Sequence, residues 1–335
     1  MAPKATAGFS FEELEREMRR YLGSVTDARS VTRAVKEVQA AQARVEKVTK
    51  SITRASLVRA AKAGYEIYDG IVHEPEPAEG KPTKEPLISS AEDSIHKARS
   101  VQTKLLPSTV PKLPGLDIAT FNRFCEQVGG DYYDFISLPR ERIGFVIADV
   151  SGKGVPAAMV MVMFRSILRM VAAHDHGPVE TMIYTNRLLV PDMLRGMFVT
   201  ALYAVIDPNA REITLANAGH YPPLLWRPRL TGTRVINIRG PALGLLDAKR
   251  FAEGLSAKTL ALESGDCLCF FTDGVPDAKN LLGEEFGEKG LARAFRDQAG
   301  QPSRKIIEAI VQAVDAHSEE APQHDDITLV VLRAL

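Results

Sequence analysis

Apolar positions in the first 72 residues repeat with the period of a helix. The stretch from Ser10 to Glu13 has the form of a capping box, and Gly23 is placed to end the short helix that it opens. In the longer helix that follows, apolar residues alternate at spacings of four and three, as in a coiled coil: Ala34, Val38, Ala41, Val45, Val48, Ile52 and Ala55. Residues 11–22 and 56–68 of the same chain could cover this seam, but its length and small residues favour a dimeric helical bundle.

The composition changes at the sequence HEPEPAEGKPTKEP, whose prolines and charges are typical of a linker. We therefore expect an all-α N-terminal domain over 1–72 and a linker over 73–110. A second capping box, Ser89–Glu92, opens a helix over about 90–106, which Pro107 ends. The apolar face of this helix carries Ile95, Ala98, Val101 and Leu105. The helix must dock on a neighbouring element, either as a switch between the domains or as a passive spacer.

The pattern from Pro111 to Leu335 is of β type. Apolar runs such as RIGFVIAD, FVTALYAVI, DCLCFFTD and DITLVVLRAL predict strands. Helical patterns come in two adjacent pairs, at about 156–174 with 179–195 and at about 285–298 with 303–317. Strands interrupted by paired helices favour an α+β sandwich over a doubly wound sheet, in which single helices and strands alternate.

Charge and composition exclude some classes of partner. Lys and Arg together number 42, as do Asp and Glu, so no general attraction to nucleic acid is expected. We find no apolar run of the roughly 20 residues that a membrane span needs and no signal peptide, which predicts a cytoplasmic protein. The three cysteines form no disulfide or zinc pattern, and Cys267 and Cys269 are expected to be buried on one face of a strand.

Acidic residues lie at the ends of three apolar runs. Asp149 follows GFVIA, Asp273 follows CLCFFT, and the pair Asp325 and Asp326 precedes ITLVV. A further acid, Asp131, follows two glycines. An aspartate beside a glycine commonly accepts hydrogen bonds within a turn, so each acid alone carries little information. Together they supply the oxygen ligands that Mg²⁺ and Mn²⁺ prefer.

Seven motifs resemble one family. GGDYYDF, ADVSGKGVPAAM, FVTALYAVID, NAGHYPPLL, GPALGL, FFTDGVPDA and HDDITLVVL occur in the order found in SpoIIE/RsbU-type phosphatases, a branch of the metal-dependent, type 2C-like (PPM) serine/threonine phosphatases. The resemblance covers about Ala91 to Leu335. It implies an αββα sandwich over 111–335, with two antiparallel sheets between outer helices and the acids at one edge.

The resemblance also implies a site and a reaction. Asp149 would bridge two Mn²⁺ or Mg²⁺ ions, the carbonyl of Val150 would add an oxygen, and Asp273 and Asp325 would complete the ligands of one ion. Asp131 would serve the other ion, directly or through water. The reaction implied is hydrolysis of phosphoserine or phosphothreonine in a protein by a metal-activated water.

The chain departs from the wider superfamily at two points. Ser151 stands where the eukaryotic enzymes have a histidine that can protonate the leaving group, so the general acid is unassigned. The arginine that binds substrate phosphate in those enzymes is also missing; Lys153 and Arg123 could replace it, or could be ordinary surface charges. His220 could supply the missing acid, but we interpret it as a turn histidine that holds its loop through hydrogen bonds.

Two function classes follow from the acids. An active phosphatase is the main hypothesis because all four acids are present, and a catalytically silent binding module with the same fold is the alternative. A GGDEF-type nucleotide cyclase does not fit the downstream motifs. By resemblance, the substrate would be a phosphorylated STAS-type anti-sigma-factor antagonist in a partner-switching pathway. An activating protein would bind the N-terminal domain and act through the helix at 90–106.

Overall fold

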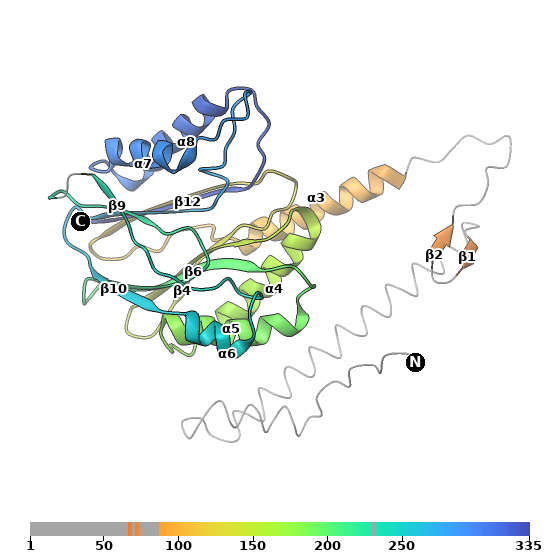
Figure 1. Ribbon diagram of the computed structural model, residues 1–335, viewed down its shortest axis with the longest axis horizontal. Coiled ribbons are helices and arrows are strands. Elements are labelled where there is room, and N and C mark those ends of the chain that lie inside the picture. Colours follow the sequence, from red (N-terminus) through yellow and green to blue (C-terminus); the bar gives the residue numbers. More distant parts are fainter. Residues whose placement is uncertain (1–65, 69–70, 74–86, 230–231) are drawn as a thin grey trace, which may run out of the picture. The chain divides into compact units, whose positions relative to one another are not determined.

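The computed structural model describes residues 66–68, 71–73, 87–229 and 232–335 (Figure 1). The chain divides into two compact units, Met1–Lys84 and Glu85–Leu335. The expected capping box at Ser10, the heptad seam and the helical bundle lie outside the described residues. The second unit contains the linker helix together with the sandwich.

The described part of the first unit is a β-hairpin. Strands β1 (Glu66–Tyr68) and β2 (Ile71–His73) pair antiparallel, with Tyr68 opposite Ile71. The expectation of helix to residue 68, within an all-α domain reaching residue 72, is therefore wrong at this point. The sequence between the strands, Asp69-Gly70, is a dipeptide that favours two-residue hairpin turns, and it separates two short runs of β-forming residues.

The second unit contains two antiparallel sheets of five strands each. The strands of the first sheet, in spatial order, are β10 (Ala257–Ala261), β7 (Glu212–Ala218), β6 (Val199–Asp207), β5 (Ile143–Val150) and β4 (Tyr132–Ser137). Those of the second are β3 (Leu116–Arg123), β12 (Ile327–Ala334), β11 (Cys267–Phe271), β8 (Leu224–Trp226) and β9 (Thr233–Val235).

Helices cover the outer face of each sheet (Figure 1). The helices beside the first sheet are α4 (Gly154–Ala172), α5 (Pro178–Leu189) with the short 3-10 helix η2 (Val190–Asp192), and α6 (Ala248–Gly254). Beside the second sheet lie α7 (Gly287–Gln298) and α8 (Ser303–Ser318). The predicted αββα sandwich is confirmed.

Strand β11 shows why its sequence is apolar throughout. Leu268 and Phe270 face the core between the sheets, where the Phe270 ring lies 4.8 Å from that of Phe145. Cys267 and Cys269 face α7 and α8 in a second apolar cluster. A strand covered on both faces cannot alternate apolar and polar residues. Both cysteines are buried free thiols on one face, as expected.

Three elements were not expected from the sequence. Strand β10 is an edge strand whose residues are mostly exposed, so it lacks an apolar pattern. Helix α6 has seven residues, and its only clear signal is the side chain of Asp247, which accepts hydrogen bonds from Lys249 N and Arg250 N. Strand β4 overlaps the GGDYYDF motif, whose two acids interrupt an apolar pattern.

Helix α3 (Leu87–Leu105) is the linker helix expected at about 90–106. Its apolar face was expected to pack along a neighbour, but Ala98 is exposed and Val101 is 59% exposed. Ile95 and Leu105 are half-buried. Docking on the sandwich occurs at the C-terminal end, where Arg165 Nε donates to Leu105 O at 2.9 Å. Gln102, in the same turn, is buried as well.

Among the described helices, α4 alone is long and apolar enough to cross a membrane by those two measures. Core helices of soluble domains pass the same test. Met161, Phe164 and Leu168 of α4 are fully buried in the core beneath the first sheet. Helix α4 is therefore a core helix of the sandwich.

Candidate active site

Three of the predicted acids line one pocket at the edge between the sheets. Asp149 lies at the end of β5, Asp273 directly follows β11, and Asp325 precedes β12. Because β11 and β12 are antiparallel neighbours, the end of one strand and the start of the other share an edge of the sheet. The pocket has a volume of about 300 Å³, and Val150 also lines it. The structure thus gathers these residues as the sequence predicted.

The acids of this pocket repel one another. Burial, followed by the charges of Asp273 and Asp325, raises the pKa of Asp149 to about 8. Burial and the neighbouring Asp325 raise the pKa of Asp273 to about 6. Such shifts show that negative charge is concentrated here without enough positive charge to offset it. Clusters of this kind are typical of catalytic and metal-binding sites.

Asp131 lies behind the pocket. It is 1% exposed, and its Oδ2 accepts hydrogen bonds from Thr272 Oγ1 at 2.8 Å and from Thr328 Oγ1 at 2.5 Å. Burial, Asp149 and Asp326 together raise its pKa well above the usual range. Sequence reasoning missed both threonines, although each stands beside a strand-end acid, in FFTDG and in DDIT.

The glycines of the GGD motif are required by close contacts. A Cβ atom on Gly130 would lie 2.8 Å from the carbonyl oxygen of Val150, and a Cβ on Gly129 would lie 1.9 Å from Asp326 Oδ2. Real Cβ atoms do not approach other atoms so closely. Glycine at position 130 therefore lets the loop before β4 approach the end of β5, and glycine at position 129 lets it approach Asp326.

The donors present fit hard divalent cations. Carboxylates and one backbone carbonyl are the oxygen ligands that Mg²⁺ and Mn²⁺ select, and Gly130 leaves the carbonyl of Val150 uncovered by a side chain. In the described part of the chain, no three His, Cys, Asp or Glu side chains are already gathered around one point. Lys153 Nζ instead lies 3.2 Å from Asp325 Oδ2. Cation binding would thus draw the acids together and compete with this lysine.

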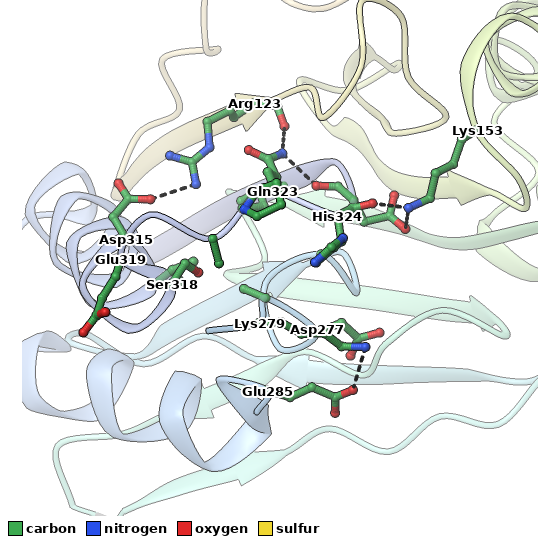
Figure 2. Close-up of a pocket in the computed structure, with 17 residues that line it drawn as sticks. Arg123, Lys153, Asp277, Lys279, Glu285, Asp315, Ser318, Glu319, Gln323 and His324 are labelled. Carbon is green, nitrogen blue, oxygen red and sulfur yellow. Dashed lines mark hydrogen bonds and ion pairs between the residues drawn. The ribbon is translucent and has the colours of Figure 1, made fainter. Parts of the chain in front are cut away.

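Lys153 and Arg123, the two predicted phosphate contacts, lie differently. Lys153 lines the acid pocket and also a neighbouring groove of about 480 Å³ (Figure 2). Arg123 lines only the groove, where its Nη2 is 2.8 Å from Asp315 Oδ1 of α8. Of the two, Lys153 is the one placed at the acids.

Ser151 and His220 both have structural partners. Ser151 Oγ accepts a hydrogen bond from Phe198 N at 2.9 Å, which joins the end of β5 to the start of β6. His220 exchanges two hydrogen bonds with the Asn217 side chain: its N donates to Oδ1 at 2.8 Å and its O accepts from Nδ2 at 2.9 Å. Burial lowers the pKa of His220 to about 4. The backbone of His220 thus holds its turn, while its ring Nδ1 lies 3.0 Å from Thr200 Oγ1 and the residue lines the acid pocket, so its interpretation as a turn histidine stays a prediction.

Comparison with known proteins identifies the family. The family model for stage II sporulation protein E (SpoIIE) matches residues 139–335. The chain belongs to the SpoIIE family. Phosphoserine phosphatase RsbU of Bacillus subtilis (strain 168) is 30% identical over 243 residues, which cover 71% of this chain and 69% of RsbU. Phosphoserine phosphatase RsbP of the same organism is 23% identical over 242 residues, covering 71% of this chain and 57% of RsbP.

Solved structures show the same fold. The SiaA-PP2C domain of Pseudomonas aeruginosa superposes with a TM-score of 0.64 at 23% identity, covering 73% of this chain and 97% of that domain. The RsbU and RsbW domains of Rv1364c from Mycobacterium tuberculosis give a TM-score of 0.56 at 25% identity, covering 69% of this chain and 63% of that one. The chain is a PP2C-type serine/threonine phosphatase of the SpoIIE/RsbU type.

Proposed function

We propose that this phosphatase hydrolyses phosphoserine or phosphothreonine in a regulatory protein, using two Mn²⁺ or Mg²⁺ ions at the strand-end acids. The observation that carries the proposal is the pocket lined by Asp149, Asp273 and Asp325, whose charges repel one another until a cation offsets them. An active enzyme explains this concentration of charge better than a silent binding module does, because a module without bound cations would carry the repulsion without benefit.

Asp149 would bridge the two ions, and the carbonyl of Val150 would add an oxygen ligand. Asp273 and Asp325 would complete one ion, and Asp131, which lies deeper, would serve the other directly or through water. When bound, such ions activate a water molecule and offset charge on the phosphoryl group. The protein itself contributes rigid placement, since each acid sits at the end of a strand.

Lys153 is the side chain best placed to contact the substrate phosphate. Lys153 Nζ lies 3.2 Å from Asp325 Oδ2, and it would leave this contact if Asp325 held a cation. The freed ammonium would remain at the mouth of the pocket, which it also lines. Arg123 would contact the substrate only along the groove, beyond the phosphate.

The substrate we propose is a phosphorylated STAS-domain protein, the anti-sigma-factor antagonist of a partner-switching pathway. Support comes from similarity to proteins named phosphoserine phosphatase RsbU and RsbP. It also comes from the structure in which RsbU and RsbW domains occur in one protein. From the heptad seam of the N-terminal region we further propose a homodimer. By resemblance to the family we propose that the enzyme acts in the cytoplasm and that an activating protein binds its N-terminal domain.

Helix α3 would carry the activating signal. Gln102, which is 3% exposed, exchanges two hydrogen bonds with Gly129: Nε2 donates to Gly129 O at 2.6 Å, and Oε1 accepts from Gly129 N at 3.0 Å. Gly129 begins the GGD loop, so a shift of α3 moves the backbone that leads to Asp131. We propose that input at the N-terminal domain controls metal binding through this contact.

The test combines metal, substrate and mutation. Purified protein is incubated with phosphorylated STAS proteins, with Mn²⁺ or with EDTA, and released phosphate is measured. We expect Mn²⁺-dependent hydrolysis that is lost in Asp149→Asn and Asp273→Asn. The control Asp207→Asn, which changes the acid at the end of β6, should keep full activity. Near-normal turnover in the first two variants, with folding unchanged by circular dichroism, would refute the metal assignment. Binding of the STAS protein without turnover would instead show a binding module.

The helix has a separate test. Fragments that start at Ser89 and at Pro111 are compared with the full chain for Mn²⁺-dependent activity. Equal activity in all three proteins would eliminate control through α3.

A further inference from the structure

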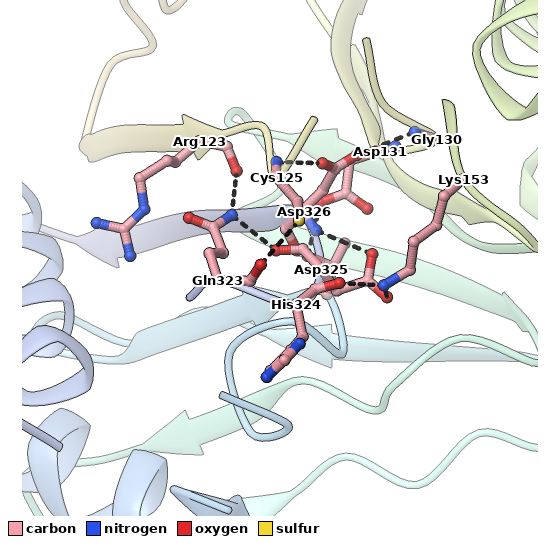
Figure 3. Close-up of polar contacts among 10 residues, drawn as sticks. Arg123, Cys125, Gly130, Asp131, Lys153, Gln323, His324, Asp325 and Asp326 are labelled. Atoms are coloured by element: carbon pink, nitrogen blue, oxygen red, sulfur yellow. Dashed lines mark hydrogen bonds and ion pairs between the residues drawn. The ribbon is translucent and has the colours of Figure 1, made fainter. Parts of the chain in front are cut away.

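Asp326 is a second residue that holds the GGD loop, beside Gln102 of α3. Its Oδ1 accepts a hydrogen bond from Cys125 N at 2.7 Å, and its Oδ2 accepts one from Gly130 N at 2.9 Å (Figure 3). Asp131 N points at the same Oδ2 from 3.5 Å. The donors belong to the segment that leaves β3 in the second sheet and enters β4 in the first. One carboxylate thus connects the two sheets at the edge where the acids gather.

The carboxylate is closely confined. Asp326 is 6% exposed, and its Oδ2 lies only 1.9 Å from the position that a Cβ on Gly129 would take. The Asp326 carboxylate therefore occupies the space in which a side chain at position 129 would lie. Backbone N–H groups bind both oxygens and so orient the carboxylate toward the loop. This agrees with the expectation that Asp325, and not Asp326, is the ligand.

Asp326 also contacts the predicted ligand beside it. Its own backbone N–H donates to Asp325 Oδ1 at 2.9 Å. One residue therefore fixes the loop that carries Asp131 through its side chain, and the orientation of Asp325 through its backbone. In the proposed function these two acids serve different ions.

We propose that Asp326 is a positioning residue of the metal centre, which sets Asp131 relative to Asp325 and so determines how tightly the pair of ions binds. This inference rests on the proposed function, because it assumes that the acids bind cations. It assigns Asp326 neither a bond to metal nor contact with the substrate.

The test measures Mn²⁺ binding by isothermal titration calorimetry on the full chain, without substrate. Asp326→Glu keeps the charge but moves the oxygens by one methylene, and Asp326→Asn keeps the size but turns one acceptor into a donor. We expect both to bind Mn²⁺ about 10-fold to 100-fold more weakly, as removal of outer-shell partners commonly does. The maximal rate at saturating Mn²⁺ should stay within a few-fold of wild type, because the ligands themselves are unchanged.

Asp207→Asn is the matched control. Asp207 Oδ1 also accepts two backbone N–H groups, from Asn209 and Ala210, in a turn without contact to the acids. If Asp326→Glu binds Mn²⁺ as tightly as this control, the carboxylate acts through charge alone and the proposal is overturned. Loss of one whole Mn²⁺ from the stoichiometry would also overturn it, since Asp326 would then be a ligand. Wild-type protein that binds no Mn²⁺ would instead refute the proposed function.

If Asp326→Glu does not fold, as judged by circular dichroism, Asp326→Asn provides the test. Its Mn²⁺ affinity and its maximal rate at saturating Mn²⁺ are then compared with those of the wild type. Weaker Mn²⁺ binding with a preserved maximal rate supports positioning. Unchanged Mn²⁺ binding contradicts it.

Discussion

Removing the Gln102 side chain should weaken metal binding without touching any metal ligand. Gln102→Ala breaks two hydrogen bonds to the Gly129 backbone, at 2.6 and 3.0 Å. Each such bond contributes about 1 kcal/mol, and the buried Gly129 groups left without partners add to the cost. We therefore expect α3 to lose about 2 kcal/mol of docking free energy. That loss corresponds to roughly a 30-fold fall in the ratio of docked to undocked helix.

The assay is hydrolysis of p-nitrophenyl phosphate as a function of Mn²⁺ concentration. If the docked helix holds the GGD loop in the metal-binding arrangement, the Mn²⁺ concentration at half-maximal rate should rise by up to 30-fold in Gln102→Ala. Gln102→Glu should be at least as damaging, because a carboxylate cannot donate to Gly129 O. Thr103→Ala is the control, since Thr103 Oγ1 bonds only to Arg99 O within the exposed face of α3. A half-maximal Mn²⁺ concentration for Gln102→Ala equal to that of the control would refute this coupling.

Three further predictions concern charge. In metal-free folded protein, the pKa of Asp149 is about 8 and that of Asp273 about 6, whereas both have the ordinary pKa of 3.8 in the unfolded chain. The folded state therefore binds more protons, and the free energy of unfolding should rise as the pH falls from about 8 to 5. The measurement is urea unfolding followed by Trp226 fluorescence at a series of pH values. The free energy of unfolding should change by about 1.4 kcal/mol per pH unit for each proton bound, and saturating Mn²⁺ should abolish this pH dependence. Lys153→Met should tighten Mn²⁺ binding in calorimetry while raising KM for a phosphoprotein, and a change in neither would contradict both roles. Arg169→Met should cost about 2–3 kcal/mol in urea unfolding, because it leaves the buried Asp134 carboxylate without its ion pair. Loss of the exposed Arg304–Glu308 pair should leave the urea midpoint almost unchanged.

The sandwich could be predicted because its strands and its acids follow strong patterns. Apolar runs such as those of β5, β11 and β12 are covered on both faces, and each has an acid at the end that reaches the pocket. The edge strand β10 escaped prediction because pairing on one side leaves its side chains exposed. The hairpin of β1 and β2 escaped prediction because the helical pattern was extended to residue 68, and Asp69-Gly70 was not recognised as a hairpin turn.

The supporting residues of the site were harder to predict than the acids. Asp149, Asp273 and Asp325 are recognisable from their position after or before an apolar run. Gln102 is an ordinary polar residue in a helix, and only the fold brings it to Gly129, 27 positions away. Thr272 and Thr328 likewise meet at Asp131 only because β11 and β12 pair. The burial of Ala98 and Val101 on α3 was wrongly predicted for the same reason. Periodicity shows which face of a helix is apolar, but it does not show which element covers that face.

The GGD loop is held by two residues from different elements, and the proposed control of the site would therefore be reciprocal. Gln102 of α3 binds Gly129, and Asp326 at the start of β12 binds Gly130, the next residue. The hydrogen-bonded path continues from Asp326 N to Asp325 Oδ1. If helix docking and metal binding are linked as proposed, the linkage acts equally in both directions: a protein that stabilises docked α3 would tighten metal binding, and bound metal would stabilise docked α3. The contacts of Gln102 and Leu105 place this linkage in the last turn of the helix.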